Sequence, residues 1–544
     1  MRHHMHVALV SLGLLGTAAC DSFLTGSGLS SDPNRPIQAS TQQVFVGVQA
    51  GQFAFQEGTV AMMMCQWIQA CGAANGRFVQ QAGQYVFGEG SNIGANQGDW
   101  ISVYDAGGLI DIRRVEAGAA AAGDSTWLGI AKIWEALTIG TAADMWGNIP
   151  YSQAGTNPTP PLDNQFAIFG QLQTVLDQAI AELTNGAGSG PGTSDLVFGG
   201  NKAKWIAAAY TLKARYFMHT AESLGTPAYQ AAVAAAANGI SDATGAGDLA
   251  SFHTAATSER NMWTQFQTSS GFGTDLEAGK FLVDELNLRK DPRLAFYFCK
   301  NVTAAWTKSK VYAVNQRILG SNGYAEIVTT AGTSGGGAEP AWPATAGTTT
   351  TDGSVVWTNQ GLPYGGDDPT TAQPASSVSS FSCLPPRFAA TARIPYVSYA
   401  ENELILSEAL NTTVNPGGND AVALTHLNNA RAFANTKFPA AAPLVALAPL
   451  AGVTGATLLD STMTEKYAAL FQNIEGISDY RRTCIPAITP AHNTQGFDRV
   501  PGRLFYPLNE RNANPNVPDP SVQLNTHQFR NVADKNPCPI AAAP

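Results

Sequence analysis

One abrupt helix end limits how this chain can fold. A clear helical run from Trp127 to Ala143 is followed directly by the stretch Asp144–Tyr151, which reads DMWGNIPY. Gly147 tolerates a left-handed turn, and Pro150 lacks the N–H that a continuing helix would need. A tryptophan and a tyrosine flank this stop. We therefore predict that both rings fix the helix end against neighbouring elements, so that the stretch acts as a joint.

Length and charge bound the class of protein. At 544 residues the chain exceeds what one ordinary core supports, so we expect two units or one large α-rich body with an insertion. Only 13% of the residues are charged, and the net charge is −10. Because no basic stripe is present to neutralise phosphates, a nucleic-acid partner is excluded.

The N-terminus has the layout of an export signal. A basic start precedes an apolar stretch from Val7 to Ala19, which is too short to span a bilayer. The small residues before Cys20 resemble a bacterial lipobox, although Thr17 stands where leucine is usual. We predict that residues 1–20 are a signal peptide, that Cys20 is lipidated, and that residues 21–40 are a tether. The alternative is a plain signal peptide cleaved near Ala19.

The remaining cysteines fit an exported protein. Six follow Cys20, and an even number permits disulfides whose connectivity the sequence leaves open. Cys65 and Cys71 are close enough to pair across a helix end. Neither a Cys-x-x-Cys nor an HExxH motif occurs, so we expect no metal site. The six are Cys65, Cys71, Cys299, Cys383, Cys484 and Cys538.

Helical periodicity dominates the chain outside one segment. Ala-rich helices recur in pairs within units of roughly 35–45 residues, which resembles tetratricopeptide-type hairpins. The segment 310–365 differs, because it is rich in Gly, Thr and short β-prone runs. It resembles a small β module of phage-tail and surface-adhesive proteins. The predicted helices are 41–69, 100–117, 125–143, 162–183, 202–221, 394–410, 421–435 and 462–473.

Several sequence stretches occur in a family-specific order. After Asp144–Tyr151 come Phe198-Gly-Gly with Lys204-Trp205 and Leu212–Tyr216, then Asp291–Leu294, then Tyr399–Glu401 with Leu406–Ala409, and finally Glu465–Phe471 with Glu475, Asp479–Arg482 and Tyr506–Glu510. Together they resemble the motifs of SusD-like (SusD/RagB family) nutrient-binding outer-membrane lipoproteins. Ile477 departs from the pattern, since tryptophan is common there. The resemblance covers most of the chain outside 310–365.

The resemblance implies a fold and a function. The fold is mainly α, a helical-repeat scaffold with an irregular C-terminal half: a body of residues 41–309 and 366–544 interrupted by the β module 310–365. The implied function is non-catalytic capture of oligosaccharide or peptide nutrients at the cell surface. The protein would be lipid-anchored in the outer membrane and would pass its ligand to a SusC-like TonB-dependent barrel, with no cofactor.

The resemblance also points to a ligand face near the loops between the N-terminal helices and residues 250–280. Aromatic faces and amides that bind sugars or peptides are candidates there. They are Trp67, Asn261, Trp263 and Phe272. Trp100 and Trp205 lie within helical apolar stripes and are predicted to be core, whereas Trp342 and Trp357 are predicted to pack the β module.

Two other classes of function remain open. A surface adhesin is favoured by the β module, and deleting 310–365 would then abolish attachment but spare nutrient uptake. An exported hydrolase would need a carboxylate pair, and Glu401 and Glu408 lie on one helical face. We interpret those carboxylates as structural partners of arginines. We likewise expect Arg481 and Arg482 to fix a helix end by fork-shaped hydrogen bonds.

Overall fold

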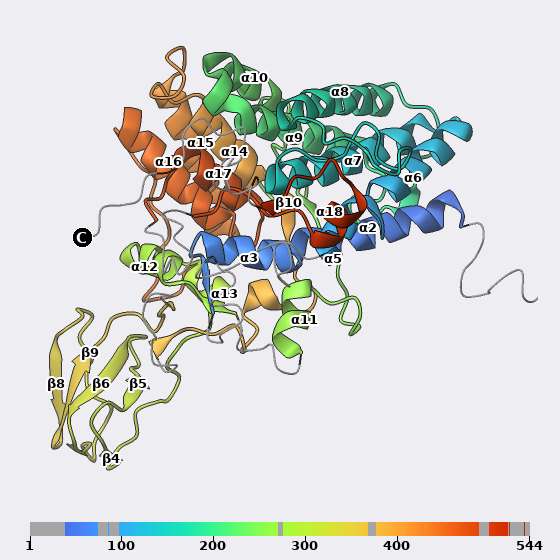
Figure 1. Ribbon diagram of the computed structural model, residues 1–544. Helices are drawn as coiled ribbons and strands as arrows, with labels where there is room; N and C mark the ends of the chain where they lie inside the picture. The colour runs from blue at the N-terminus through green and yellow to red at the C-terminus, as the bar shows by residue number, and fades with distance from the viewer. Residues whose placement is uncertain are drawn as a thin grey trace, which may run out of the picture.

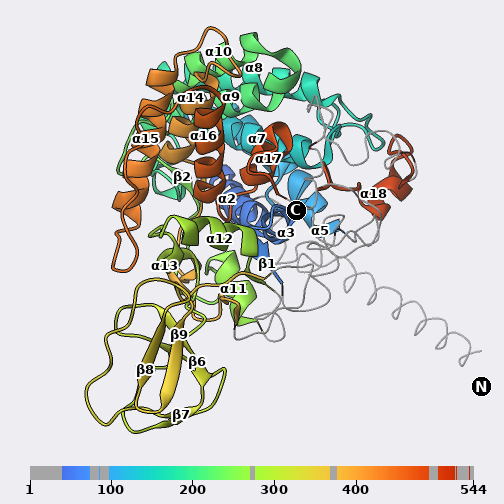
Figure 2. The same cartoon turned by 90° about the vertical axis from the view of Figure 1, so that its left-hand side faces the viewer.

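The computed structural model describes residues 39–73, 85, 97–269, 276–367, 377–488, 500–520, 522 and 538. The predicted signal peptide and most of the tether, with Cys20, lie outside these residues. The body is arranged as layers (Figures 1 and 2). Helical hairpins form the upper layer, two N-terminal helices cross beneath them, short helices follow, and a β module projects at the far end.

The upper layer consists of antiparallel helices that pack against their neighbours in sequence, as the predicted helical repeats require. The helical-repeat fold is confirmed. Sequence pattern alone missed two of these helices, α10 and α17. The layer comprises α7 (Ser125–Trp146), α8 (Gln165–Thr184), α9 (Lys202–Leu224), α10 (Thr226–Ala236), α14 (Tyr399–Ala409), α15 (Asp420–Lys437), α16 (Gly455–Ala469) and α17 (Glu475–Thr483).

Helix α7 is the central element of this layer, because it is buried on nearly all sides. At Gly140 the helix approaches α9 so closely that a Cβ would lie 2.2 Å from the hydroxyl oxygen of Tyr216. That hydroxyl donates a 2.7 Å hydrogen bond to the carbonyl oxygen of Ala136. The helix ends at Trp146, where Gly147 adopts φ 83° and its N–H bonds to Ala143. The predicted stop is therefore confirmed, three residues later than the apolar run suggested.

The N-terminal helices cross below the hairpins and are more broken than predicted. The run near 41–69 is two helices, α2 (Thr41–Glu57) and α3 (Thr59–Trp67), that meet at Gly58. The predicted helix 100–117 is divided into α5 (Gln97–Tyr104) and α6 (Leu109–Ala121), because Gly107 takes φ 93° between them. The short helices α11 (Met262–Thr268) and α13 (Leu294–Tyr297) lie below them, and α12 (Lys280–Leu288) lies at about the height of α3 (Figure 1).

The β module has its own sheet and its own core. Four antiparallel strands pair in the order β5-β6-β9-β8, and β4 pairs with β7. Trp342 and Trp357 pack at 5.7 Å between ring centroids, as predicted, within a cluster that includes Tyr312. The strands are β4 (Val311–Tyr312), β5 (Arg317–Leu319), β6 (Ala325–Thr330), β7 (Gly332–Thr333), β8 (Thr349–Asp352) and β9 (Val355–Asn359).

Short strands and disulfides join distant parts of the body. Strand β1 (Cys71–Gly72) pairs with β3 (Glu277–Ala278), and β2 (Leu249–Ala250) pairs with β10 (Pro395–Val397). Strand β10 occupies the start of the predicted helix 394–410, so that helix begins only at Tyr399.

Disulfides join Cys65 to Cys71, Cys299 to Cys383 and Cys484 to Cys538. The second of these bonds brackets the two ends of the β module. The described residues also include three minor helices: η2 (Gly192–Ser194), η4 (Pro386–Phe388) and α18 (Leu508–Ala513).

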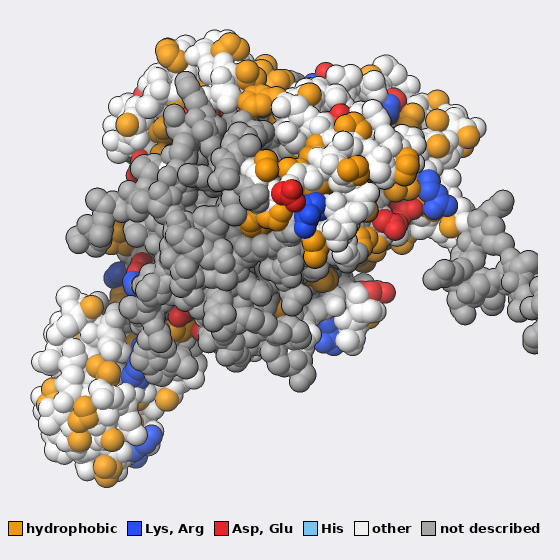
Figure 3. Space-filling view, in the orientation of Figure 1, with side chains coloured by type: hydrophobic (Ala, Val, Ile, Leu, Met, Phe, Trp, Pro, Cys, Tyr) orange, Lys and Arg blue, Asp and Glu red, His pale blue; other side chains and the backbone are white. Residues whose placement is uncertain are grey.

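The surface reflects the low charge of the sequence. On the coloured part of the face in Figure 3, acidic and basic side chains are few among apolar and uncharged ones. Within the described ranges, no helix is long and apolar enough to cross a membrane.

The buried ionic joint and a candidate ligand groove

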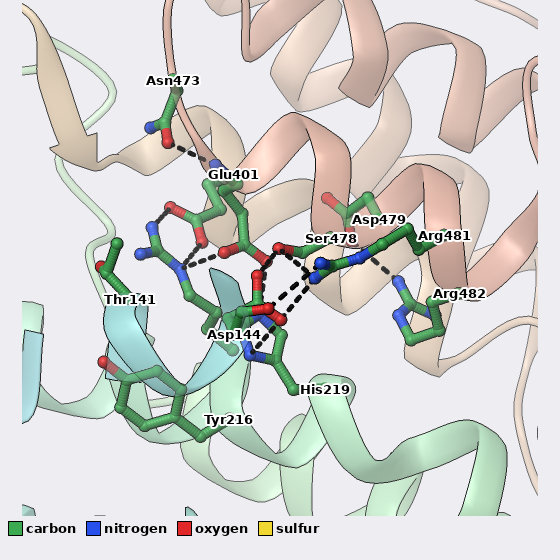
Figure 4. Close-up of polar contacts among 12 residues, drawn as sticks. Thr141, Asp144, Tyr216, His219, Glu401, Asn473, Ser478, Asp479, Arg481 and Arg482 are labelled. Atoms are coloured by element: carbon green, nitrogen blue, oxygen red, sulfur yellow. Dashed lines mark hydrogen bonds and ion pairs between the residues drawn. The ribbon is translucent and has the colours of Figure 1, made fainter. Parts of the chain in front are cut away.

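The last turn of α7 is the centre of a buried ionic joint (Figure 4). One carboxylate oxygen of Asp144 lies 2.6 Å from Nη2 of Arg481, and the other accepts a hydrogen bond from the hydroxyl of Ser478. The same guanidinium donates to the carbonyl oxygens of Asp144 and Gly502 at 3.1 and 2.7 Å. Asp144 therefore ties the end of α7 to α17 and to the C-terminal segment.

A second pair within the joint links α9 to α14. Arg215 binds Glu401 through two hydrogen bonds of 2.6 Å, and Glu475 lies 3.5 Å from the same guanidinium. Burial opposes the charge on Arg215, but the two carboxylates outweigh it and raise the pKa of the guanidinium. His219, one turn further along α9, is 2.7 Å from Glu475 and 3.8 Å from Asp144. Each of these side chains is buried, so the charges are neutralised within the protein and not by water.

The adjoining cluster joins α14, α16 and α17. Arg482 grips Glu408 with both terminal nitrogens and also lies 2.8 Å from Asp479. Lys466, which is 1% exposed, lies 2.8 Å from Asp479. Burial opposes ionisation of Asp479, yet Lys466 and Arg482 hold the pKa of its carboxyl below the ordinary value. The fork-shaped bonds expected of Arg481 and Arg482 are confirmed.

A third cluster fixes the Asp291–Leu294 turn. Arg293 lies 2.6 Å from Asp291 and 2.7 Å from Glu465, and Arg431 approaches Glu465 to 3.0 Å. The arginines lower the pKa of both carboxyls against the opposing effect of burial. The family motifs thus converge on three ion clusters that lock helices together. Glu401 and Glu408 are each gripped by a guanidinium, so this pair offers no free acid and base.

The C-terminal segment closes over the joint. The indole N–H of Trp146 donates to the carbonyl oxygen of Phe505 at 3.0 Å, and the N–H of Leu504 donates to Met145 at 2.8 Å. The Trp146 ring also packs edge-on against Trp100 at 5.4 Å. Trp146 is fully buried, and Tyr151 is buried as well. These contacts confirm the predicted role of the stretch as a joint.

We expect the joint to make the stability of the protein depend on pH in the neutral to alkaline range. Burial opposes the charge on His219, but Glu475 and Asp144 outweigh it and raise its pKa above 6.5. The stability that this charge contributes is complete below the unfolded pKa of about 6.5 and is lost as pH rises through the folded pKa. Chemical denaturation should show that His219→Gln costs most near about pH 6, with the deficit shrinking toward about pH 9. A deficit that is constant over this range would contradict the assignment.

The structure places the predicted ligand residues in different surroundings. Trp67 and Trp263 are 1% and 0% exposed, and Trp263 packs edge-on against Phe388 at 5.5 Å. Asn261 caps α11 by accepting from the N–H of Trp263 and donates to the carbonyl oxygen of Ala392. Phe272 lies outside the described residues. In this conformation neither indole presents a face to solvent, and the ligand role of these residues stays a prediction.

A groove nevertheless lies at the predicted face, between α2 and the segment 252–265. It has a volume of about 360 Å³. Val46, Ala50 and Ala54 form one wall, because positions four apart share one face of α2. Phe252, which is 44% exposed, lines the groove with Met262. These residues were missed because single exposed apolar residues carry no motif.

Hydrogen bonds and ring contacts of buried residues fix the floor of the groove. His253 lies 3.0 Å from the buried carboxylate of Glu57, which also accepts from the hydroxyl of Tyr396 at 2.9 Å. Phe53 packs edge-on against His253 at 6.1 Å. Polar side chains of Thr254, Ser258, Glu259, Arg260 and Gln265 complete the lining. An exposed ring beside several hydrogen-bonding groups suits a ligand that is partly apolar and rich in hydroxyls. Among the described residues, no cluster of three or more metal-ligating side chains occurs.

Comparison with known proteins agrees with this architecture. The sequence pattern of the SusD-like family described as "Starch-binding associating with outer membrane" matches residues 33–332, more than half of the chain. A curated-sequence comparison finds no significant relative.

Several solved structures share the fold. A SusD/RagB family protein from Bacteroides thetaiotaomicron is 18% identical, with 92% of this chain and 98% of that chain covered at a TM-score of 0.61. A SusD homolog from Bacteroides fragilis is 16% identical, with 92% and 99% covered at 0.63. A chitin-binding SusD homolog from Flavobacterium johnsoniae is 17% identical, with 90% and 96% covered at 0.61. From its sequence match and its fold, this chain belongs to the SusD-like family.

Proposed function

We propose that this protein is a non-catalytic, lipid-anchored protein of the outer membrane that captures oligosaccharide or peptide nutrients. It would hand them to a SusC-like TonB-dependent barrel. The family match supports the nutrient role, and the groove between α2 and residues 252–265 is the observation that carries it. Lipidation of Cys20 would supply the anchor.

An oligosaccharide is the better-supported ligand of the two. A related fold belongs to a chitin-binding protein, and the family is described as starch-binding. The groove supplies an exposed ring in Phe252, on which a pyranose face can stack, and hydrogen-bonding groups in Gln265 and Arg260. Binding and release require only differential affinity, so no cofactor enters the proposal.

The groove is tested by Phe252→Ala. Loss of one stacking ring should weaken binding by roughly 1 kcal/mol, about fivefold, without lowering the melting temperature. Isothermal titration with maltohexaose and chitohexaose measures the affinity. Leu288→Ala, which removes another exposed apolar side chain (82% exposed), should leave it unchanged. The groove is not the ligand site if the sugar that binds the wild-type protein binds the Phe252→Ala variant with the same affinity.

Adhesion through the β module is the second candidate function. This function is favoured because the module projects away from the helical body and has its own aromatic core (Figure 2). Deletion of 310–365 leaves the disulfide between Cys299 and Cys383 in place, which holds the two cut ends of the chain close together. Loss of surface attachment with intact sugar binding would support adhesion as an added role.

A further inference from the structure

A second cavity lies between α15 and the segments 245–250 and 387–398. Its volume is about 320 Å³. Tyr297 and Arg293 are buried at its inner end, whereas Arg393 and Lys437 are exposed at its lining. The cavity is therefore open to solvent at a rim that carries two cations.

Arg387 lines this cavity with an unusual set of partners. Its Nε donates to the side-chain oxygen of Gln472 at 3.1 Å, and one terminal nitrogen donates to the carbonyl oxygen of Phe471 at 3.3 Å. Its guanidinium lies 6.0 Å from the ring centre of Tyr297. Within the described part of the chain, no carboxylate lies at ion-pair distance from it. Burial lowers the pKa of Arg387, which means that its charge is poorly compensated.

Arg393 repeats this arrangement. It donates to the carbonyl oxygens of Ser251 and Ala250 at 2.6 and 3.1 Å, and no described carboxylate is paired with it. Lys437 lies 5.5 Å above the ring of Phe433. Neutral acceptors thus hold the two arginines in place without cancelling their charge. The ion-paired Arg215 and Arg293 differ in this respect.

The charges that line the cavity do not balance. Glu465 is already shared among Arg293 and two other arginines. The remaining carboxylate is that of Asp248, which accepts from the N–H of Tyr399 at 2.8 Å, and burial raises its pKa to about 7. At neutral pH it carries only part of a negative charge. Arg387, Arg393 and Lys437 therefore leave a net positive cavity.

Aromatic rings contribute to the lining, beside several small residues. Phe198, Phe433 and Phe438 border the cavity together with Tyr297. A compact inorganic anion would leave these apolar faces unused, whereas a sugar ring bearing a carboxylate would use both the rings and the cations. We propose that this cavity is a second binding site, specific for an acidic sugar residue of the uronic acid class. Its carboxylate pairs with Arg387 and the rim cations.

The test uses the full-length purified protein and isothermal titration. Trigalacturonate should bind at least about tenfold more tightly than the neutral maltotriose, and its affinity should fall as salt is raised. Equal affinities for the two sugars would overturn the proposal. So would displacement of trigalacturonate by equimolar inorganic phosphate, because the cavity would then be a general anion site.

Matched variants locate the site. Arg393→Gln and Lys437→Gln change exposed side chains and should each weaken trigalacturonate binding about three- to tenfold, and Arg387→Gln by more than about tenfold. Lys308→Gln removes an exposed lysine just before the β module and should have no effect. Unchanged affinity in both rim variants overturns the proposal, whether or not Arg387→Gln folds. Phe252→Ala should spare trigalacturonate binding, so failure at this cavity and failure at the groove are distinguishable.

Discussion

Replacement of Trp146 by alanine will lower the free energy of unfolding by about 3–5 kcal/mol, as truncation of large core aromatics does. The ring is fully buried, it packs on Trp100, and its N–H holds the carbonyl oxygen of Phe505. The variant leaves a cavity and an unpaired carbonyl group at the point where the C-terminal segment crosses α7. Equilibrium denaturation in urea measures the loss.

The matched control for Trp146→Ala is Phe252→Ala, which removes an aromatic ring that is 44% exposed. That change should alter stability by less than about 0.5 kcal/mol. A Trp146→Ala variant as stable as the wild type but unable to bind sugar would contradict the structural role. It would make Trp146 a ligand residue.

Asp479→Asn should be similarly damaging, at about 3–5 kcal/mol, because it removes one partner from a buried ion cluster. Lys466 and Arg482 would then share the carboxylate of Glu408, which lies 3.6 Å from the lysine nitrogen, and one buried positive charge would be uncompensated. Because the folded pKa of Asp479 is depressed, its contribution is present above its unfolded pKa of 3.8 and is lost as pH falls through the folded value. Denaturation at neutral pH measures the loss directly.

The control for this variant is Asp284→Asn, which breaks the exposed pair of Asp284 with Lys280. Both side chains are about half exposed, at 53% and 47%. Exposed pairs contribute about 0–1 kcal/mol, so the change should be small. Equal effects of the two substitutions would contradict the account of Asp479 as part of a buried cluster.

The sequence was sufficient to predict the joint but not which residues form ion pairs within it. A helix stop and two aromatic residues indicated that Asp144–Tyr151 is structural. The partner of Asp144 could not be read from spacing, because Arg481 is 337 residues away. Helix α17 was missed for a related reason. Its buried face carries Glu475, Asp479 and Arg482, which reverses the usual pattern of apolar residues toward the core.

The proposed ligand groove could likewise be predicted only in part. The family resemblance pointed to the region around residues 250–280, and the groove lies there. Adjacent residues of the short helix α11 point to different sides: Met262 lines the groove, whereas Trp263 is buried. The cationic cavity left no trace in sequence, because its residues come from separate segments and follow no motif. Large aromatic residues indicate packing more reliably than they indicate a binding platform.

Isolation of the protein from detergent-solubilised outer membranes of its own host tests the central claim most directly. Pulled down through a C-terminal tag, the protein should carry lipid on Cys20 and should bring with it, in near-stoichiometric amount, a TonB-dependent β-barrel of the SusC type. Repeated recovery as a lone, unlipidated protein without a barrel would contradict the proposed role in nutrient capture and transfer.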